Sequence, residues 1–258
     1  MLTSEAKSSV TVSPPGPLLW ERGKHEPGEP TNMQQSIQPT QGGSLDESQL
    51  ANRFRATWRR CAGGQASPEP VWEMLRRHYR EPHRHYHTLN HLAQCLRELD
   101  LAGTEVAETE ATEMAIWFHD VIYRYGAKDN ETLSAQAFRE LAGPHMPAGF
   151  IDRVGEFIIA TQHTGSARDS GEAFMVDIDL SGFGLPWEGY LADSDALREE
   201  APDIEDSQYY AGKLRFLDGL LSWQRLFQTD YFRDRLEQRA RENIKRYSTD
   251  LRARGFGA

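Results

Sequence analysis

The chain has 258 residues and a formal net charge of −10, with 38% hydrophobic and 26% charged residues. This length suits one large domain or two small ones. The acidic balance argues against a general binder of nucleic-acid polymers, because such proteins need clustered positive charge. No apolar run reaches the roughly 18 residues of a membrane-spanning helix. We therefore expect neither a nucleic-acid polymer nor a membrane as a partner.

The first 44 residues differ in composition from the rest of the chain. They hold six of the 13 prolines, many Gly, Ser, Thr and Gln residues, and no helical or strand-like apolar periodicity. Such a segment buries too little apolar area to offset the entropy of ordering. We expect a disordered tail over residues 1–44 and a folded domain over residues 45–250.

The chain lacks the apolar core of a secretory signal before a small-residue cleavage site. Its two cysteines, Cys61 and Cys95, lie on apolar faces of predicted helices and have no CxxC spacing. This pattern is typical of reduced, buried thiols rather than of a disulfide framework. A cytoplasmic location is the expectation that follows.

Apolar residues recur at helical spacing after residue 45. Ser44 and Glu47 have the spacing of a capping box, and Leu50, Phe54 and Trp58 follow four apart, which predicts a helix that begins near residue 45. The same periodicity, with Gly and Pro as stop signals, predicts further helices. In chain order they cover about 69–79, 88–101, 108–124, 130–141, 150–161, 205–228 and 230–247.

One segment, residues 173–180, departs from the helical pattern. Its apolar and acidic residues alternate as AFMVDIDL, and alternation alone predicts a strand. No other strand pattern and no internal repeat occurs, so the predicted class is all-α.

Histidine is concentrated in one part of the chain. Eight of the nine histidines fall between residues 78 and 163, and five lie between His78 and His91. His87 and His91 are four residues apart, so on a helix or its first turn both imidazoles face the same way. His119 and Asp120 place a nitrogen and an oxygen ligand together at the end of an apolar helix, where an unpaired carboxylate is costly.

The order of these residues is more specific than any single pair. A His at 91, His-Asp at 119–120 and an Asp near 179 resemble the H…HD…D pattern of the HD superfamily of metal-dependent phosphohydrolases. The flanking residues resemble a bacterial branch of that superfamily, and the resemblance covers roughly residues 47–247. The flanking segments are FHDVIY at 118–123, DNE at 129–131, SA at 134–135, ATQHT at 160–164 and DIDL at 177–180.

The resemblance implies a bundle of helices around one divalent metal ion, and it makes residues 173–180 helical. The implied ligands are His91, His119, Asp120 and Asp179, with Asp177 as the competitor of Asp179. Nitrogen and oxygen ligands of this kind suit Mn, Fe, Co, Ni or Zn, and the sequence does not choose among them.

The segment YHTLNH at 86–91 is also similar to the YHNxxH segment of cyclic-nucleotide phosphodiesterases. In that family the first His protonates the leaving oxygen and the second binds metal, which implies that His87 is the general acid and His91 a ligand. Asp120 is counted with the catalytic residues as well as the ligands. Glu131 is expected to orient the water or to anchor His87, or else to be a first-turn carboxylate favoured by the helix dipole.

Three further residues are candidates for contact with substrate. Arg84 could meet a phosphate, or it could be one of several solvated arginines. Asn130 begins a predicted helix beside the metal-bearing segment. His163 could face substrate, or it could be a histidine at the edge of the core.

The expected function is hydrolysis of a phosphoester, of a nucleotide or a similar small phosphorylated metabolite, by a metal-activated water. One alternative is an HD-fold di-iron oxygenase, with His163 as an additional ligand. Another is a nucleotide-sensing HD module without turnover. The expected partner is the small phosphorylated substrate, and a homodimer is compatible with the sequence.

Overall fold

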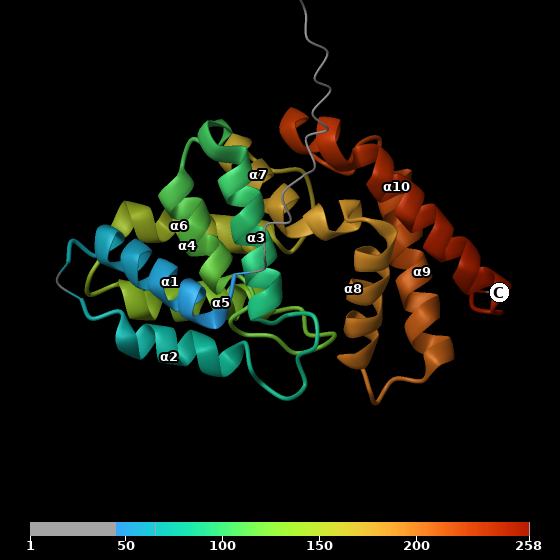
Figure 1. Cartoon of the computed structure of the whole chain (residues 1–258), viewed down its shortest axis with the longest axis horizontal. Coiled ribbons are helices and arrows are strands. Elements are labelled where there is room, and N and C mark those ends of the chain that lie inside the picture. The colour runs from blue at the N-terminus through green and yellow to red at the C-terminus, as the bar shows by residue number, and fades with distance from the viewer. Residues whose placement is uncertain (1–44, 65, 258) are drawn as a thin grey trace, which may run out of the picture. The chain divides into compact units, whose positions relative to one another are not determined.

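The computed structural model describes residues 45–64 and 66–257, which lie within one compact unit, Gly43–Ala258. The described residues form helices and contain no strand, which confirms the all-α prediction (Figure 1). The predicted tail, residues 1–44, lies outside the described residues. The α-helices are α1 (Glu47–Cys61), α2 (Glu69–His78), α3 (Leu89–Ala102), α4 (Thr109–Phe118), α5 (Asn130–Ala142), α6 (Ala148–Ala160), α7 (Ser170–Leu180), α8 (Trp187–Glu199), α9 (Asp206–Ser222) and α10 (Asp230–Ala253).

Two short 3₁₀ helices complete the secondary structure, η1 (Gly103–Glu105) and η2 (Ser181–Gly184). Within the described part of the chain, no helix is long and apolar enough to cross a membrane.

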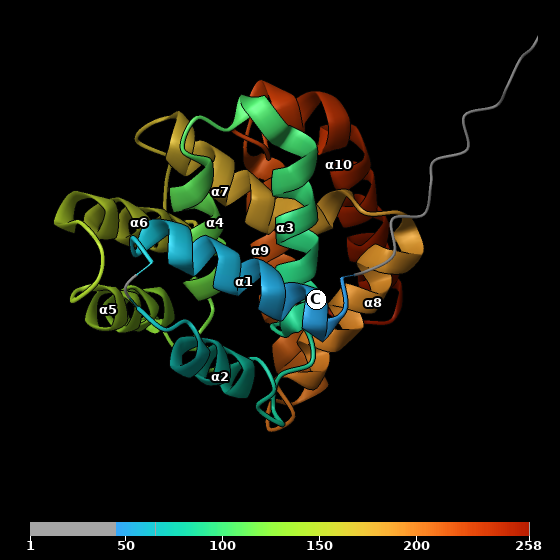
Figure 2. The same cartoon turned by 60° about the vertical axis from the view of Figure 1, so that its left-hand side comes forward.

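Helix α4 forms the centre of the unit. Every residue from Ala111 to Phe118 is buried, as expected of a helix that is apolar on all sides. Figure 2 shows α4 behind α1, with α3 on one side and α6 on the other, and each of these helices packs against it. The aromatic rings of Phe54, Trp72 and Trp117 pack against one another between α1, α2 and α4.

The first helix has a capping box, but it begins two residues later than predicted. Helix α1 begins at Glu47, and its N-cap is Asp46 rather than Ser44. The Asp46 carboxylate accepts from the backbone N–H of Gln49, and the Gln49 side chain accepts from the backbone N–H of Asp46. Asp is as good an N-cap as Ser, so the composition alone did not distinguish the two starts.

Helix α4 ends at Phe118, earlier than the predicted end near residue 124. The guanidinium of Arg84 takes the carbonyls of Asp120 and Val121 as acceptors, at 2.6 and 3.0 Å. These carbonyls would otherwise accept hydrogen bonds within a longer helix. Helical pairing is already lost before these residues, where the carbonyl of Ile116 accepts from the His119 ring and that of Trp117 from the Tyr79 hydroxyl. Arg84 therefore binds the backbone just beyond the end of α4.

Residues 173–180 belong to helix α7, as the family resemblance implied and as alternation did not. Asp169 caps this helix by accepting from the backbone N–H groups of Gly171 and Glu172. All but one of its residues from Gly171 to Leu180 are buried, so apolar residues occur on every face and the helical period disappears from the sequence.

Helix α8 was not among the predicted elements. It follows η2 and lies beside α9 in Figure 1, on the side of the unit away from α1, α2, α5 and α6. Only Tyr190 and Ser194 of this helix are buried, so its apolar periodicity is weak. The chain turns sharply at its end, and the following residue, Glu200, is again buried.

Candidate metal centre

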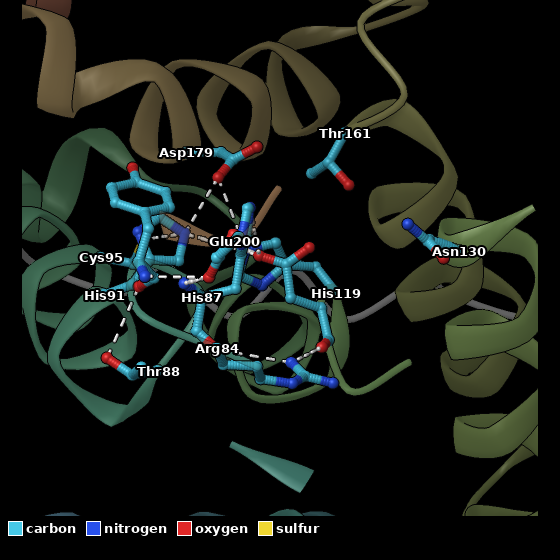
Figure 3. A network of polar contacts seen from close by, with 12 residues as sticks. Arg84, His87, Thr88, His91, Cys95, His119, Asn130, Thr161, Asp179 and Glu200 are labelled. Carbon is cyan, nitrogen blue, oxygen red and sulfur yellow. Dashed lines mark hydrogen bonds and ion pairs between the residues drawn. The ribbon is translucent and has the colours of Figure 1, made fainter. Parts of the chain in front are cut away.

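Three helices converge to form the candidate metal centre, and each contributes through one end. His91 lies in the first turn of α3, His119 and Asp120 directly follow α4, and Asp179 lies in the last turn of α7. One ligand atom from each of these four residues lies within 4.8 Å of the others. The metal site that the sequence predicted is therefore assembled by residues from three separate parts of the chain (Figure 3).

The two imidazole rings approach each other with their Nε2 atoms. The Nε2 atoms of His91 and His119 are 3.2 Å apart. Asp120 Oδ2 lies 2.9 Å from the His119 nitrogen and 3.7 Å from the His91 nitrogen. Asp179 Oδ1 lies 3.4 and 3.2 Å from the same two atoms.

The hydrogen bond at the far side of the His119 ring determines which nitrogen can bind a cation. His119 Nδ1 lies 2.9 Å from the carbonyl of Ile116 and donates to it, so Nε2 carries the lone pair. A second-sphere hydrogen bond of this kind is what metal-binding histidines use. The His91, Asp120 and Asp179 atoms beside it are also acceptors. Such an arrangement fits a transition metal cation bound by nitrogen and oxygen.

The electrostatics of these four side chains indicate the same need for positive charge. Burial disfavours the charged imidazole, but Asp120 and Asp179 outweigh it and raise the pKa of His119 well above its usual value. Burial also opposes ionisation of Asp179, but His119, His163 and His91 hold the pKa of this carboxyl well below its usual value. The two carboxylates therefore favour a positive charge among the four side chains.

The neighbouring carboxylates Asp177 and Asp179 have separate roles. Asp179 points into the cluster, whereas Asp177 accepts from the backbone N–H groups of Gln228 and Thr229 and from the Thr229 hydroxyl, at 2.7–2.8 Å. Thr229 is the N-cap of α10. Asp177 therefore attaches the start of α10 to α7, and the structure supports Asp179 as the ligand.

His87 lies next to the cluster and is held there by Glu200. Its Nε2 atom is 4.0 Å from Asp120 Oδ2, and its Nδ1 atom is 2.6 Å from Glu200 Oε2. The other carboxylate oxygen of Glu200 accepts from the backbone N–H groups of His85, Tyr86 and His87, each at 2.9 Å. The ring of Tyr123 stacks on His87, with centroids 3.9 Å apart.

The charge on Glu200 is strongly favoured by these contacts. Burial alone would raise its pKa, but the hydrogen bond and charge of the His87 ring and the backbone N–H groups of His87 and His85 lower the pKa to about 2. Glu200 therefore stays ionised near neutral pH and fixes the His87 ring in one orientation.

Glu131, which was predicted to anchor His87 or orient water, makes no hydrogen bond or ion pair with any described residue of the cluster. The contact that anchors His87 belongs to Glu200 instead. Nothing in the local sequence separates Glu200 from the exposed Glu199, because both end a charged run at the close of α8. Glu200 reaches the site through a long-range tertiary contact with residues 85–87.

Arg84 is buried, and its guanidinium donates to groups of the protein itself. Besides the carbonyls of Asp120 and Val121, it donates to Glu81 at 2.9 Å and to the carbonyl of His87 at 3.4 Å. It fixes the backbone of the candidate acid and of a candidate ligand relative to each other (Figure 3). These are positioning contacts, and the predicted contact of Arg84 with a substrate phosphate stays a prediction.

Asn130 also contacts the backbone rather than the cluster. Its side chain donates to the carbonyl of Arg124 and accepts from the N–H of the same residue, which closes the loop between α4 and α5. In Figure 3 it lies apart from the histidines, on α5. His163 does reach the cluster, because its Nε2 atom is 2.9 Å from Asp179 Oδ2.

Two cavities adjoin the cluster. One, of about 540 Å³, lies between the segment that follows α6 and the segment that joins α9 to α10. It is lined by His163, Thr164, Gly165, Ser166, Trp223, Gln224, Arg225 and Gln228. The other, of about 40 Å³, is lined by Asp179, Tyr86 and residues of α8 and α9. The site is thus open on the side of α7 and of the segment that joins α9 to α10.

Comparison of the chain with protein-family models, with curated proteins and with solved structures found no match. The structure itself shows a helical unit with a buried group of histidines and aspartates that could hold a metal ion, which is compatible with an HD-like site.

The two carboxylates of α7 provide a direct test of the site. We expect Asp179→Ala to abolish binding of stoichiometric metal with little loss of stability. Asp177→Ala should retain the metal but lower the free energy of unfolding by roughly 2–4 kcal/mol, because three donors lose their acceptor in the interior. Metal analysis and urea denaturation of both variants check this. If Asp177→Ala loses the metal and Asp179→Ala keeps it, then Asp177 is the ligand and the prediction is wrong.

The low pKa of Glu200 predicts a specific pH dependence of stability. A depressed carboxyl pKa stabilises the fold above the unfolded value, near 4.5, and this stabilisation disappears as the pH falls toward about 2. The difference in unfolding free energy between the wild type and Glu200→Gln should therefore be about 2–3 kcal/mol at pH 7 and should shrink below pH 4.5. Glu199→Gln is the matched control, and equal pH profiles for both variants would contradict the prediction.

Proposed function

We propose that this protein is an HD-type, metal-dependent phosphohydrolase that cleaves a phosphoester of a nucleotide or a similar small phosphorylated metabolite. The observation that carries the proposal is the placement of His87. Its free nitrogen is 4.0 Å from a carboxylate of the candidate metal site, while its other nitrogen is committed to Glu200. A ligand cluster with an adjacent, separately anchored histidine supplies what phosphoester hydrolysis requires.

The metal would be held by His91, His119, Asp120 and Asp179, and when bound it would act as a Lewis acid and lower the pKa of a bound water. The protein's own contribution is to hold a proton where the leaving oxygen departs. Because His87 Nδ1 faces Glu200, a protonated His87 presents its Nε2–H toward the cluster. An imidazole is a suitable general acid near neutral pH.

Two further residues keep this acid in place. Arg84 binds the carbonyls of both His87 and Asp120, so the distance between the acid and the metal site is set through one rigid side chain. Tyr123 covers one face of the His87 ring and limits its rotation. Correct positioning of a general acid accounts for much of its effect on rate.

The cavity beside His163 supports a small organic substrate. Its volume of about 540 Å³ is in the usual range for small-molecule sites. Trp223, 38% exposed, offers an aromatic face, and Arg225 offers a cation on the same wall. An aromatic face and a cation together favour a nucleotide-like molecule with a planar group and a negative charge.

The proposal is tested by purifying the protein, measuring its metal content and screening phosphoesters with each of Mn, Fe, Co, Ni and Zn. We expect one equivalent of metal per chain and metal-dependent release of a phosphorylated or free phosphate product. Two irons per chain with no hydrolysis would instead indicate an oxygenase. Tight nucleotide binding without turnover would indicate a sensing module, and either result would overturn the proposal.

The role of His87 predicts a dependence on the leaving group. We expect His87→Ala to retain its metal and to lower turnover by about 10²–10⁴-fold on alkyl phosphoesters, the usual range for one general acid. Nitrophenyl esters, whose leaving group needs no proton, should lose much less. Turnover of both ester classes and metal content are measured on this variant and on the control His145→Ala, whose imidazole is exposed.

An equal loss on both ester classes, or loss of the metal, would show that His87 is a structural residue or a ligand. Glu200→Gln should show the same leaving-group dependence in weaker form, because it acts through the orientation of His87. Glu199→Gln should leave both activities unchanged.

A further inference from the structure

A second pair of opposite charges lies beside the metal centre and is not used in the chemistry described above. Asp193 lies on α8, and Lys213 lies on α9. The ammonium of Lys213 is buried. This burial lowers its pKa to about 8, although the charge of Asp193 opposes the shift. The ammonium therefore remains charged near neutral pH.

These two charges do not form an ion pair. The Lys213 ammonium lies 6.0 Å from the centroid of the Phe216 ring, and among the described residues no carboxylate oxygen lies within 4.0 Å of it. Asp193 Oδ2 is buried and has no hydrogen-bond partner in the same part of the chain. Buried charges are normally paired, because an uncompensated charge in the interior is costly. An ammonium and a carboxylate left apart in this way indicate a place for a polar ligand.

The space between them is the small cavity that adjoins the metal centre. Asp179, a candidate metal ligand, and Lys213 both line it, together with Asp193 and Gly182. A Cβ atom at Gly182 would lie 3.3 Å from Asp193 Oδ2 and 3.4 Å from the Tyr86 hydroxyl. The absence of a side chain at residue 182 therefore keeps this space open on the side of η2.

The size and charge of the cavity limit what it can accept. Its volume is about 40 Å³, which is close to that of a single water molecule in the liquid. Such a space admits a single oxygen atom of a bound ligand and no organic substituent. A phosphoryl oxygen is also the acceptor that a lysine ammonium commonly binds.

We propose that Lys213 binds a non-bridging oxygen of the substrate's phosphoryl group, on the Asp179 side of the metal centre. This inference rests on the proposed phosphohydrolase function. Asp193 is a positioning residue that helps keep Lys213 charged and directed into the cavity.

The test compares Lys213→Met with Lys245→Met, a matched change at an exposed lysine of α10. Both full-length proteins are loaded with Mn²⁺, and the affinity for inorganic phosphate is measured by calorimetry. We expect Lys213→Met to weaken phosphate binding by about ten- to hundredfold, as expected for loss of a charged hydrogen bond, and to keep its metal. Lys245→Met should differ from the wild type by less than about twofold.

Ester hydrolysis provides the second readout. Lys213→Met should lower kcat/KM for nitrophenyl phosphate by about ten- to hundredfold, whereas Lys245→Met should not change it. If the wild type does not hydrolyse this ester but binds phosphate through Lys213, the proposed function fails and the subsite stands. If Lys213→Met binds phosphate as well as the wild type does, the inference is overturned even if hydrolysis is found.

The wild type alone offers a check that does not depend on the variant's folding. Saturating phosphate should protect Lys213, but not Lys245, from an amine-acylating reagent at pH 8, as measured by mass spectrometry of the modified peptides. Equal labelling of Lys213 with and without phosphate in the Mn²⁺-loaded protein would contradict the proposal.

Discussion

Two imidazole nitrogens and two carboxylates meet in the interior of this protein, and they can do so only if a positive charge lies among them. Four acceptors at 2.9–3.7 Å would repel one another without a cation or a proton. The helices that carry them must therefore be fixed by other contacts before the site can form. Much of the polar structure around the cluster serves this purpose: Arg84 binds the backbone that follows α4, Asp177 attaches α10 to α7, and Glu200 holds the segment before α3.

These supporting contacts share one physical form, a buried ionised side chain that satisfies several backbone groups. Glu200 accepts from three consecutive N–H groups, and Arg84 donates to carbonyls on two different segments. Irregular backbone in the interior needs partners for its polar groups, because it has no helix to supply them. Charged side chains meet this need with strong hydrogen bonds, and they fix the backbone of the loops that bear His87 and Asp120.

The sequence predicted the residues whose types and order are unusual, and it failed where a common residue has an uncommon position. His91, His119, Asp120 and Asp179 form a pattern that few chains contain, so their meeting in space could be expected from a resemblance. Glu200 and Arg84 belong to the commonest charged types, and each lies among others of its kind. Their roles depend on contacts across 36 to 115 residues of chain, which no local pattern records. For the same reason the end of α4 was misplaced, since the cause lies outside the helix.

The pair of aspartates near the end of α7 also limits how this segment can change in evolution. The two carboxylates are separated by one residue, which on an α-helix turns them about 200° apart, so one faces the cluster and the other faces the start of α10. Insertion or deletion of one residue upstream within the helix would turn both by about 100° and remove both contacts together. Because both contacts depend on it, the length of α7 before Asp177 cannot change, so homologous chains that keep both contacts should align through this segment without a gap.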